Sequence, residues 1–216
     1  MGSMTTYLYL HGFASGPRSA KAQYLANRFT ELGLALQIPD LNQGDFSHLT
    51  LTRQIQQVEA ELPVTPVTLI GSSFGGLTAA WLAQRQRQVE RLVLLAPAFQ
   101  FLDHWLPRLG AAQQQLWATE GYLSIYHYIE QSRLPLHYGF MTDAQQYRDE
   151  DLQRSVPTLI LHGRSDDTIP IAASRRFASA RPWVTLMELE SDHGLTDVIA
   201  SIWIEIQKFC ALAQVM

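Results

Sequence analysis

Residues 67–76 read VTLIGSSFGG, a short apolar run that leads directly into a glycine–serine turn. The run is typical of a buried parallel strand, and the apolar residues that follow at helical spacing predict a helix. The turn matches G-x-S-x-G, with Ser73 between Gly71 and Gly75. In a turn this sharp, a side chain at either flanking position would collide with neighbouring backbone. The pattern therefore predicts an exposed serine hydroxyl at the carboxyl end of a strand.

Short apolar runs alternate with longer amphipathic ones along most of the chain, which is typical of βαβ units. We predict an α/β fold with a mostly parallel sheet of about six strands and helices on both faces. The expected strands are 6–10, 34–38, 67–70, 92–95, 158–161 and 185–189, and the expected helices are 19–32, 51–62, 74–85, 171–180 and 196–212.

The stretch 99–156 interrupts this alternation and contains no good candidate for a parallel strand. A connection of this length is either functional or disordered, and its many aromatic residues argue against disorder. We predict a helical cap over one end of the sheet, inserted between core segments 5–98 and 157–216. Most of its aromatic side chains are expected to form a core of the cap's own, and a few to line a substrate pocket.

A serine hydroxyl is a weak nucleophile until a base takes its proton and a third group orients that base. In a site of this kind the chain order is serine, acid, histidine. Asp166 and Asp167 follow the expected strand 158–161, and His193 follows the expected strand 185–189. We favour Asp166 as the acid, while Asp167, which would suit a helix N-cap, stays open as the alternative. The order Ser73, Asp166, His193 predicts a catalytic triad.

Two backbone N–H groups are expected to stabilise negative charge on a substrate carbonyl oxygen. One belongs to Phe74, at the start of the helix after the serine, and the other to Phe13, which follows His11 and Gly12 at the end of the first strand. His11 precedes the serine in the chain, which is the wrong order for the base. We therefore assign His11, Gly12 and also His162 to supporting positions beside the site.

The composition excludes several classes of function. Lys and Arg number 16 and Asp and Glu number 20, and the net charge of −4 argues against nucleic acid as a partner. A single cysteine, Cys210, allows no intrachain disulfide and no cysteine zinc site, which fits a reducing, cytoplasmic location. No apolar run reaches the length of a membrane span, and the start lacks the pattern of a signal peptide.

Phosphate-loop, dinucleotide and zinc-hydrolase motifs are lacking in the sequence, so we expect no cofactor and no metal. Residues 1–4 are expected to be a cloning remnant or a disordered start.

The chain resembles the α/β-hydrolases from Thr5 onward. Its opening, YLHGFASGPRSAKA at 9–22, is similar to the YLHGF-x-S-x-P-x-S-x-KA start of the small bacterial YqiA-like esterases, of the uncharacterised UPF0227 type. The turn 71–76, GSSFGG, is similar to their GSSLGG. The segment SDHG at 191–194 departs from a more usual glycine-rich approach to the histidine. The resemblance implies a triad of the residues named above and activity on short-chain esters and acyl thioesters.

These features predict a serine hydrolase that cleaves small-molecule carboxylic esters or thioesters through an acyl-enzyme. The same triad would also serve a hydrolase of carbon–carbon bonds, lactones or short peptides, and a non-catalytic binding protein could share the fold. An acyl-CoA substrate would require basic residues at the mouth of the pocket. The candidates for that role are Arg18, Lys21, Arg175 and Arg176.

Overall fold

The computed structural model describes residues 5–212, so the expected cloning remnant at 1–4 lies outside the described residues. A six-stranded sheet with the order β2-β1-β3-β4-β7-β8 forms the centre of the molecule, and every neighbouring pair is parallel. This sheet confirms the predicted α/β class. The strands are β1 (Thr6–Leu10), β2 (Leu36–Gln37), β3 (Val67–Ser72), β4 (Val89–Leu95), β7 (Thr158–Gly163) and β8 (Val184–Leu189).

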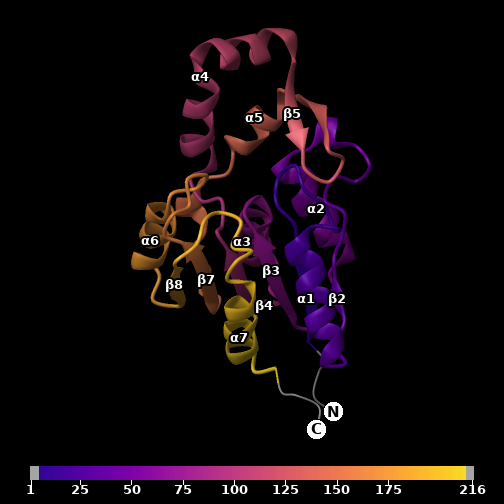
Figure 1. The fold of residues 1–216 in the computed structure, drawn as a ribbon, viewed down its shortest axis with the longest axis vertical. Coiled ribbons are helices and arrows are strands. Elements are labelled where there is room, and N and C mark those ends of the chain that lie inside the picture. The colour runs from indigo at the N-terminus through magenta and orange to yellow at the C-terminus, as the bar shows by residue number, and fades with distance from the viewer. Residues whose placement is uncertain (1–4, 213–216) are drawn as a thin grey trace.

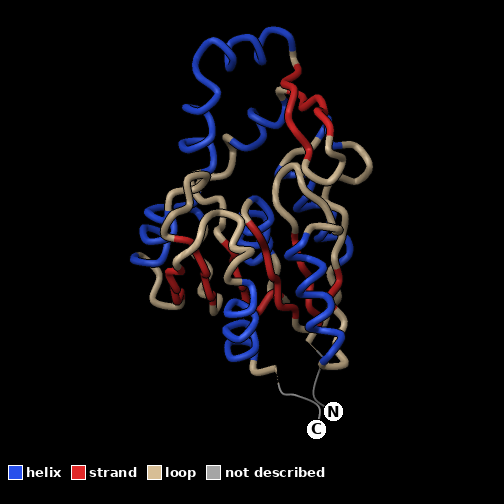
Figure 2. The backbone as a smooth tube through the Cα atoms, viewed as in Figure 1, coloured by secondary structure: helices blue, strands red, loops and turns tan. Residues whose placement is uncertain are grey.

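Helices cover both faces of the sheet. Alternate residues of each strand point to opposite sides, so each strand contributes apolar side chains to a core on both faces. In β1, Tyr7 and Tyr9 pack into the hydrophobic cluster under α1 (Ala20–Glu31) and α7 (Ile199–Cys210). Leu8 and Leu10 pack into the cluster on the other face. That face is covered by α2 (Leu51–Glu61), α3 (Phe74–Arg85) and α6 (Ile171–Ser179), and the strands lie between the two layers (Figure 2).

Segment 99–156 stands above the sheet in Figure 1. It contains α4 (Phe101–Glu120), β5 (Tyr122–His127), β6 (Ser132–His137), α5 (Gly139–Ala144) and a 3-10 turn at Asp149–Asp151. A second 3-10 turn, at Phe46–His48, lies before α2. Strands β5 and β6 pair as an antiparallel hairpin, which the sequence analysis did not predict. Helix α4 bends sharply at Gly110, where φ is 72°. The bend divides α4 into two arms. The first arm, before Gly110, is the one that follows β4 in the chain.

The aromatic residues of segment 99–156 do not form a separate core, contrary to our expectation. The buried ones, Phe99, Trp117 and Phe140, belong to the same cluster as Leu8 and the helices α2 and α3. Others face solvent, such as Tyr122 and Tyr128. Segment 99–156 is therefore held to the sheet by a shared hydrophobic core. Within residues 5–212, no helix has the length and apolar character needed to cross a membrane.

Gly75 lets α3 pass very close to the end of β1. A Cβ atom at this position would lie 2.2 Å from the Leu10 carbonyl oxygen and 2.4 Å from that of His11. A Cβ at Gly71 would lie 2.4 Å from the Gly75 oxygen. Both distances are far inside van der Waals contact, and both obstacles are backbone atoms that cannot rotate away. The two glycines of the turn are thus required by its packing, as the motif predicts.

We expect Gly75→Ala to lower the free energy of unfolding by at least about 3 kcal/mol, because the new methyl group must push β1 and α3 apart. Gly33→Ala is the matched control: φ is +70° there and a Cβ would meet nothing within 4 Å. That control should cost only about 1–2 kcal/mol of backbone strain. Urea unfolding of both variants measures the difference, and equal losses would contradict the close packing at Gly75.

Candidate active site

Three loops at the carboxyl end of the sheet bring Ser73, His193 and Asp166 together. Ser73 lies between β3 and α3 with φ 53° and ψ −119°. This is a strained backbone conformation, which persists only where the surrounding packing holds it in place. The His193 Nε2 atom lies 3.0 Å from Ser73 Oγ, and its Nδ1 atom lies 2.7 Å from Asp166 Oδ2. Ser73 and His193 are both half-buried, so a small molecule can reach them. This chain of contacts can pass a proton from the hydroxyl to the imidazole while the carboxylate holds the ring.

Asp166 is the acid that the fold places beside His193. Its Oδ1 atom accepts hydrogen bonds of 2.8 Å from the backbone N–H groups of Thr168 and Ile169. Burial acts to raise the pKa of this carboxyl, but the hydrogen bonds from His162 and His193 outweigh it and hold the pKa well below its usual range. Asp167 is exposed, and within residues 5–212 its carboxylate accepts a hydrogen bond only from the Thr168 hydroxyl, at 3.2 Å. Asp166 is therefore ionised at neutral pH, as a group that orients a cationic imidazole must be.

His162 has a defined position beside this carboxylate. Its Nε2 atom lies 3.0 Å from Asp166 Oδ2 and 2.9 Å from the Ile169 carbonyl oxygen, while Nδ1 lies 2.7 Å from Ser174 Oγ. Both neighbours of Nε2 are acceptors, so Nε2 carries the proton and Nδ1 accepts from the serine hydroxyl. His162 thus shares Asp166 Oδ2 with His193 and helps to hold the carboxylate in place. A supporting position beside the site is also what the sequence predicts for His162.

His11 is enclosed below the loop that follows β1. Its Nε2 atom accepts the Leu41 N–H at 2.9 Å, so Nδ1 carries the proton and donates to the Gly12 oxygen at 3.0 Å. Burial lowers the pKa of His11, which keeps the ring neutral in this role. A Cβ at Gly12 would lie 3.4 Å from Ser73 Cβ, so this loop passes directly beside the serine.

The N–H groups of Phe13 and Phe74 are available to a ligand. Among residues 5–212, neither of these two amides donates a hydrogen bond to a turn, loop or side-chain acceptor. Phe74 begins α3, where the helix dipole adds partial positive charge. Both donors therefore lie in loops beside Ser73, since Phe13 follows Gly12 and Phe74 follows the serine itself.

A ring of aromatic side chains lies over these donors. The Phe13 ring lies 6.1 Å from that of Phe74, 6.3 Å from Phe101, 5.7 Å from Trp105 and 5.3 Å from Phe140. Phe13, Phe101 and Trp105 are only half-buried, so part of their surface is open to a ligand. Because α4 supplies two of these rings, segment 99–156 and the sheet region together form an apolar wall beside the serine.

Lys21 supports the loop that carries His193, a role that the sequence analysis did not assign. Its Nζ atom, on α1, donates a 2.8 Å hydrogen bond to the carbonyl oxygen of Gly194. Burial lowers the Lys21 pKa to about 8, although Asp192 and Asp166 favour the charged form. A Cβ at Gly163 would lie 2.3 Å from the Ser191 oxygen, so β7 also packs closely against this loop.

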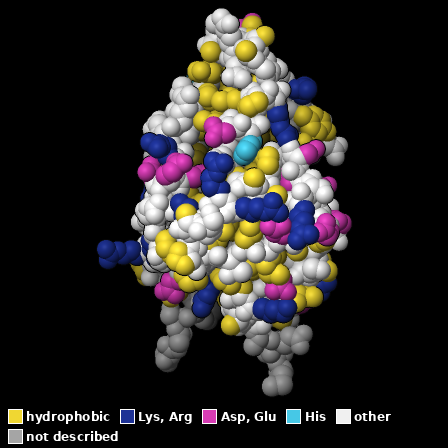
Figure 3. All heavy atoms as spheres, turned by 90° about the vertical axis from the view of Figure 1, so that its left-hand side faces the viewer, with side chains coloured by type: hydrophobic (Ala, Val, Ile, Leu, Met, Phe, Trp, Pro, Cys, Tyr) yellow, Lys and Arg dark blue, Asp and Glu magenta, His cyan; other side chains and the backbone are white. Residues whose placement is uncertain are grey.

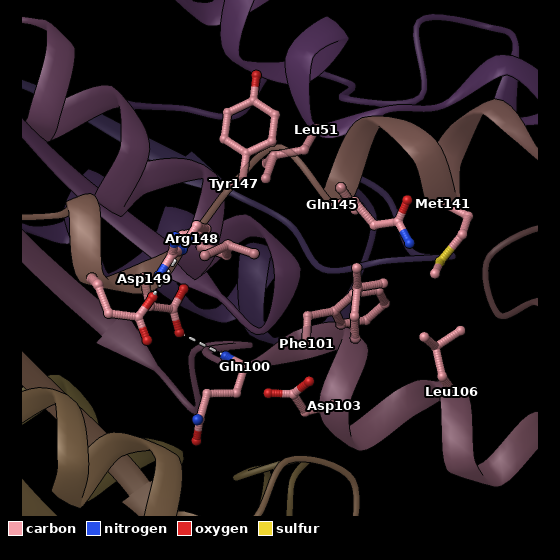
Figure 4. A pocket seen from close by; sticks show the side chains of 14 residues that line it. Leu51, Gln100, Phe101, Asp103, Leu106, Met141, Gln145, Tyr147, Arg148 and Asp149 are labelled. Atoms are coloured by element: carbon pink, nitrogen blue, oxygen red, sulfur yellow. Dashed lines mark hydrogen bonds and ion pairs between the residues drawn. The ribbon is translucent and has the colours of Figure 1, made fainter.

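A separate cavity of about 350 Å³ lies between α4, α5 and the segment that follows α5 (Figure 4). One end is polar and the other apolar, and the triad residues are not among those that line it. At its polar end, Asp149 Oδ2 accepts the N–H of Gln100 at 2.7 Å, just before α4 begins. Burial raises the pKa of Asp149 to about 6, although this hydrogen bond opposes the shift. Asp149 therefore ties the two ends of segment 99–156 together at an electrostatic cost.

We expect Asp149→Asn to stabilise the protein at pH 8 by about 2 kcal/mol and to have little effect at pH 4. The folded-state pKa lies above that of the unfolded chain, so the wild type loses stability as pH rises from about 4 through about 6. Asparagine keeps an oxygen for the Gln100 N–H and carries no charge. Urea unfolding at both pH values is the measurement, and an equal gain at both would contradict this explanation.

The family model described as "Uncharacterised protein family (UPF0227)" matches residues 6–211. The chain belongs to this family.

Solved structures with the same fold include Est1E from Butyrivibrio proteoclasticus with bound ferulic acid. Its sequence is 21% identical, and the TM-score is 0.79 over 97% of this chain and 89% of that one. Mouse alpha/beta hydrolase domain-containing protein 10 shows 20% identity and a TM-score of 0.72, over 96% and 92% of the two chains. The alpha/beta hydrolase GrgF from Penicillium sp. sh18 shows 13% identity and a TM-score of 0.74, over 100% and 92%. These similarities establish the α/β-hydrolase fold.

The four basic residues named as candidates for binding an acyl-CoA differ in their partners in this UPF0227 protein. Lys21 is bound to Gly194, Arg18 lies 3.8 Å from Glu130, and Arg175 forms a 2.7 Å ion pair with Glu188. Arg176 is exposed and takes no part in the ion pairs found within residues 5–212.

Proposed function

We propose that this protein is a serine hydrolase that cleaves small-molecule carboxylic esters or thioesters. The observation that carries the proposal is the continuous contact from Ser73 Oγ through His193 to Asp166, with separations of 3.0 and 2.7 Å. The α/β-hydrolase fold and the two free N–H groups beside the serine support it. In this reading segment 99–156 is the cap that forms one wall of the substrate site.

The reaction begins when Ser73 Oγ attacks the substrate carbonyl carbon and His193 Nε2 takes the hydroxyl proton. The carbonyl oxygen becomes negative and accepts hydrogen bonds from the N–H groups of Phe13 and Phe74. The tetrahedral intermediate then collapses, the bond to the leaving oxygen or sulfur breaks, and His193 gives its proton to that atom. The acyl group stays on Ser73 as an ester.

Water completes the cycle. His193 takes a proton from the water while the water oxygen attacks the acyl carbon, and the second tetrahedral intermediate again places its charge on the two N–H groups. Collapse breaks the bond to Ser73, and His193 returns the proton to the serine oxygen. The carboxylic acid leaves. Asp166 stays ionised throughout and stabilises the imidazolium that forms in each half.

Hydrolysis of p-nitrophenyl esters from C2 to C16 tests the proposal. Each CH₂ buried against the aromatic wall contributes about 0.8 kcal/mol, so kcat/KM should rise about fourfold per carbon over the first members. Beyond the reach of Phe13, Phe101 and Trp105 the gain should end, and the C16 ester should be at least about tenfold poorer than the best one. Mass spectrometry of the products separates ester cleavage from cleavage of a carbon–carbon bond. Absence of turnover on every ester and thioester would contradict the proposal.

A further inference from the structure

We propose that Phe101 sets the length of the acyl chain that this enzyme accepts, because its ring lies between the aromatic wall beside Ser73 and the cavity between α4 and α5. The inference rests on the proposed hydrolase function and adds to it the residue that selects among substrates. In the wild type the Phe101 ring ends the acyl site. The cavity behind the ring is space that a longer chain would enter if the ring were smaller.

Phe101 belongs to both features. The aromatic wall consists of the rings of Phe13, Phe74, Phe101, Trp105 and Phe140. The Phe101 ring lies 6.3 Å from that of Phe13 and 5.1 Å from that of Phe74, and these two residues carry the free N–H groups beside the serine. Of the five wall residues, Phe101 is the one that also lines the cavity in the described part of the chain. The Phe101 ring therefore lies between the two spaces.

Contacts on several sides hold the Phe101 ring in place. It stacks on Trp105 with the ring centroids 5.3 Å apart and 24° between the ring planes, and it meets the Phe140 ring edge-on at 5.8 Å. Just before it in the chain, Gln100 takes the left-handed conformation with φ 53°, and its N–H donates to Asp149. A ring held in this way forms a fixed end of the site and not a gate that opens.

The acyl half of the substrate, and not the leaving group, lies against this ring. The leaving group must be beside His193, which gives it a proton in the proposed reaction. The wall residues come from the loop after β1 and from α3, α4 and α5. Within residues 5–212, the loop that carries His193 contributes no residue to the lining of the cavity. Because the two groups on the carbonyl carbon point away from each other, the acyl chain takes the side of the wall.

The accessible part of the wall is apolar. Phe13, Phe101 and Trp105 are only half-buried. Figure 3 shows the face of the molecule that carries α4 and α6, where apolar side chains gather on the upper part, segment 99–156, and charged side chains on the part below it. An uncharged acyl chain suits this surface, since each CH₂ that it buries there contributes to binding.

The cavity has room for part of an acyl chain. Its volume of about 350 Å³ is near the lower limit for small-molecule pockets, which is about 300 Å³. Leu106 and Met141 line it with apolar surface on the side where Phe101 lies (Figure 4), whereas Asp103 and Asp149 line its polar end. A chain that passed the ring would therefore bury a few more carbons and then meet carboxylates.

Phe101→Ala should shift the enzyme toward longer acyl chains. The ratio of kcat/KM for p-nitrophenyl octanoate to that for p-nitrophenyl butyrate should rise at least about tenfold in the variant, because each further CH₂ that is buried contributes about fourfold. The change should appear mainly in KM, since the added contacts are remote from the reacting carbon. The C16 ester should stay poor, because its chain would reach the polar end of the cavity.

Leu109→Ala is the matched control. Leu109 is on the same arm of α4 and packs against the same core, but it is not among the described residues that line the cavity. The ratio of octanoate to butyrate should stay within about twofold in this variant. Phe101→Leu serves as a second variant if circular dichroism shows that Phe101→Ala does not fold, and it should raise the ratio at least about threefold.

An unchanged ratio in a folded Phe101 variant would overturn the inference. A gain for octyl acetate over butyl acetate, without a gain for octanoate over butyrate, would also overturn it, because the leaving group would then lie against the ring.

A binding measurement separates this inference from the proposed function. Octanoate is titrated calorimetrically into Ser73→Ala protein and into Ser73→Ala/Phe101→Ala protein. Binding that is at least about tenfold tighter to the double variant supports the inference even if no ester is turned over. Equal binding to the two proteins would show that the inference is wrong, and hydrolysis of p-nitrophenyl butyrate by the wild type would then leave the hydrolase proposal intact.

Discussion

Ser73→Ala is expected to lower kcat for p-nitrophenyl butyrate by roughly 10⁴-fold or more while leaving the fold intact. The substitution removes the oxygen that lies 3.0 Å from His193 Nε2, and with it the only atom placed to form the acyl bond in the proposed reaction. The free N–H groups and the aromatic wall stay in place, so some acceleration over water should remain. The side chain is small and half-buried, and the loss of one hydrogen bond should cost only about 1 kcal/mol of stability.

Ser72→Ala is the matched control for this experiment. Ser72 is the same residue type one position earlier and is buried, but the side-chain hydrogen bonds of His193 within residues 5–212 go to Ser73 and Asp166 instead. Its kcat should stay within about tenfold of the wild type, with circular dichroism spectra of both variants unchanged. Near-normal turnover by Ser73→Ala would show that the assigned nucleophile is wrong.

Asp166→Asn should lower kcat by about 10³- to 10⁴-fold, for a reason that the hydrogen bonds define. The amide oxygen will face the N–H groups of Thr168 and Ile169, which now donate to Oδ1. The amide NH₂ then faces His193, whose Nδ1 must accept from it. In that tautomer the proton is on Nε2, and the imidazole cannot take the proton of Ser73.

Asp167→Asn controls for the change of charge, because its carboxylate is exposed and contacts only the neighbouring Thr168. Its kcat should stay within about twofold. Steady-state kinetics on both variants therefore test which of the two adjacent aspartates is the acid. If Asp167→Asn were the slower enzyme, the assignment of Asp166 would have to be reversed.

The turn around Ser73 could be predicted from the sequence because its determinants are local. A buried apolar strand, two glycines and a helix start are consecutive in the chain, and the close approach of Gly75 to Leu10 follows from the sharpness of the turn. The parallel sheet could be predicted for the same reason, since each strand appears as its own apolar run. The choice between Asp166 and Asp167 could not be made with certainty. It depends on how the 163–169 loop directs its backbone N–H groups.

The hairpin of β5 and β6 could not be predicted because its signals are weak. Pro135 lies within β6, and the connection contains no glycine, so Gln131 takes the left-handed conformation with φ 49°. The role of Lys21 was also inaccessible. Lys21 contacts Gly194, 173 residues later in the chain. Such contacts form only when distant segments of the chain meet in the folded protein, so no local sequence pattern predicts them.

Labelling with a fluorophosphonate probe tests the central claim most directly, because this reagent forms a covalent bond with a serine that is activated by a neighbouring base. We expect the wild-type protein to gain the mass of one adduct, peptide mapping to place it on Ser73, and the Ser73→Ala variant to gain none. The Ser72→Ala control should label like the wild type. Labelling that persists in folded Ser73→Ala protein, or a folded wild type that does not react, would contradict the proposed nucleophile.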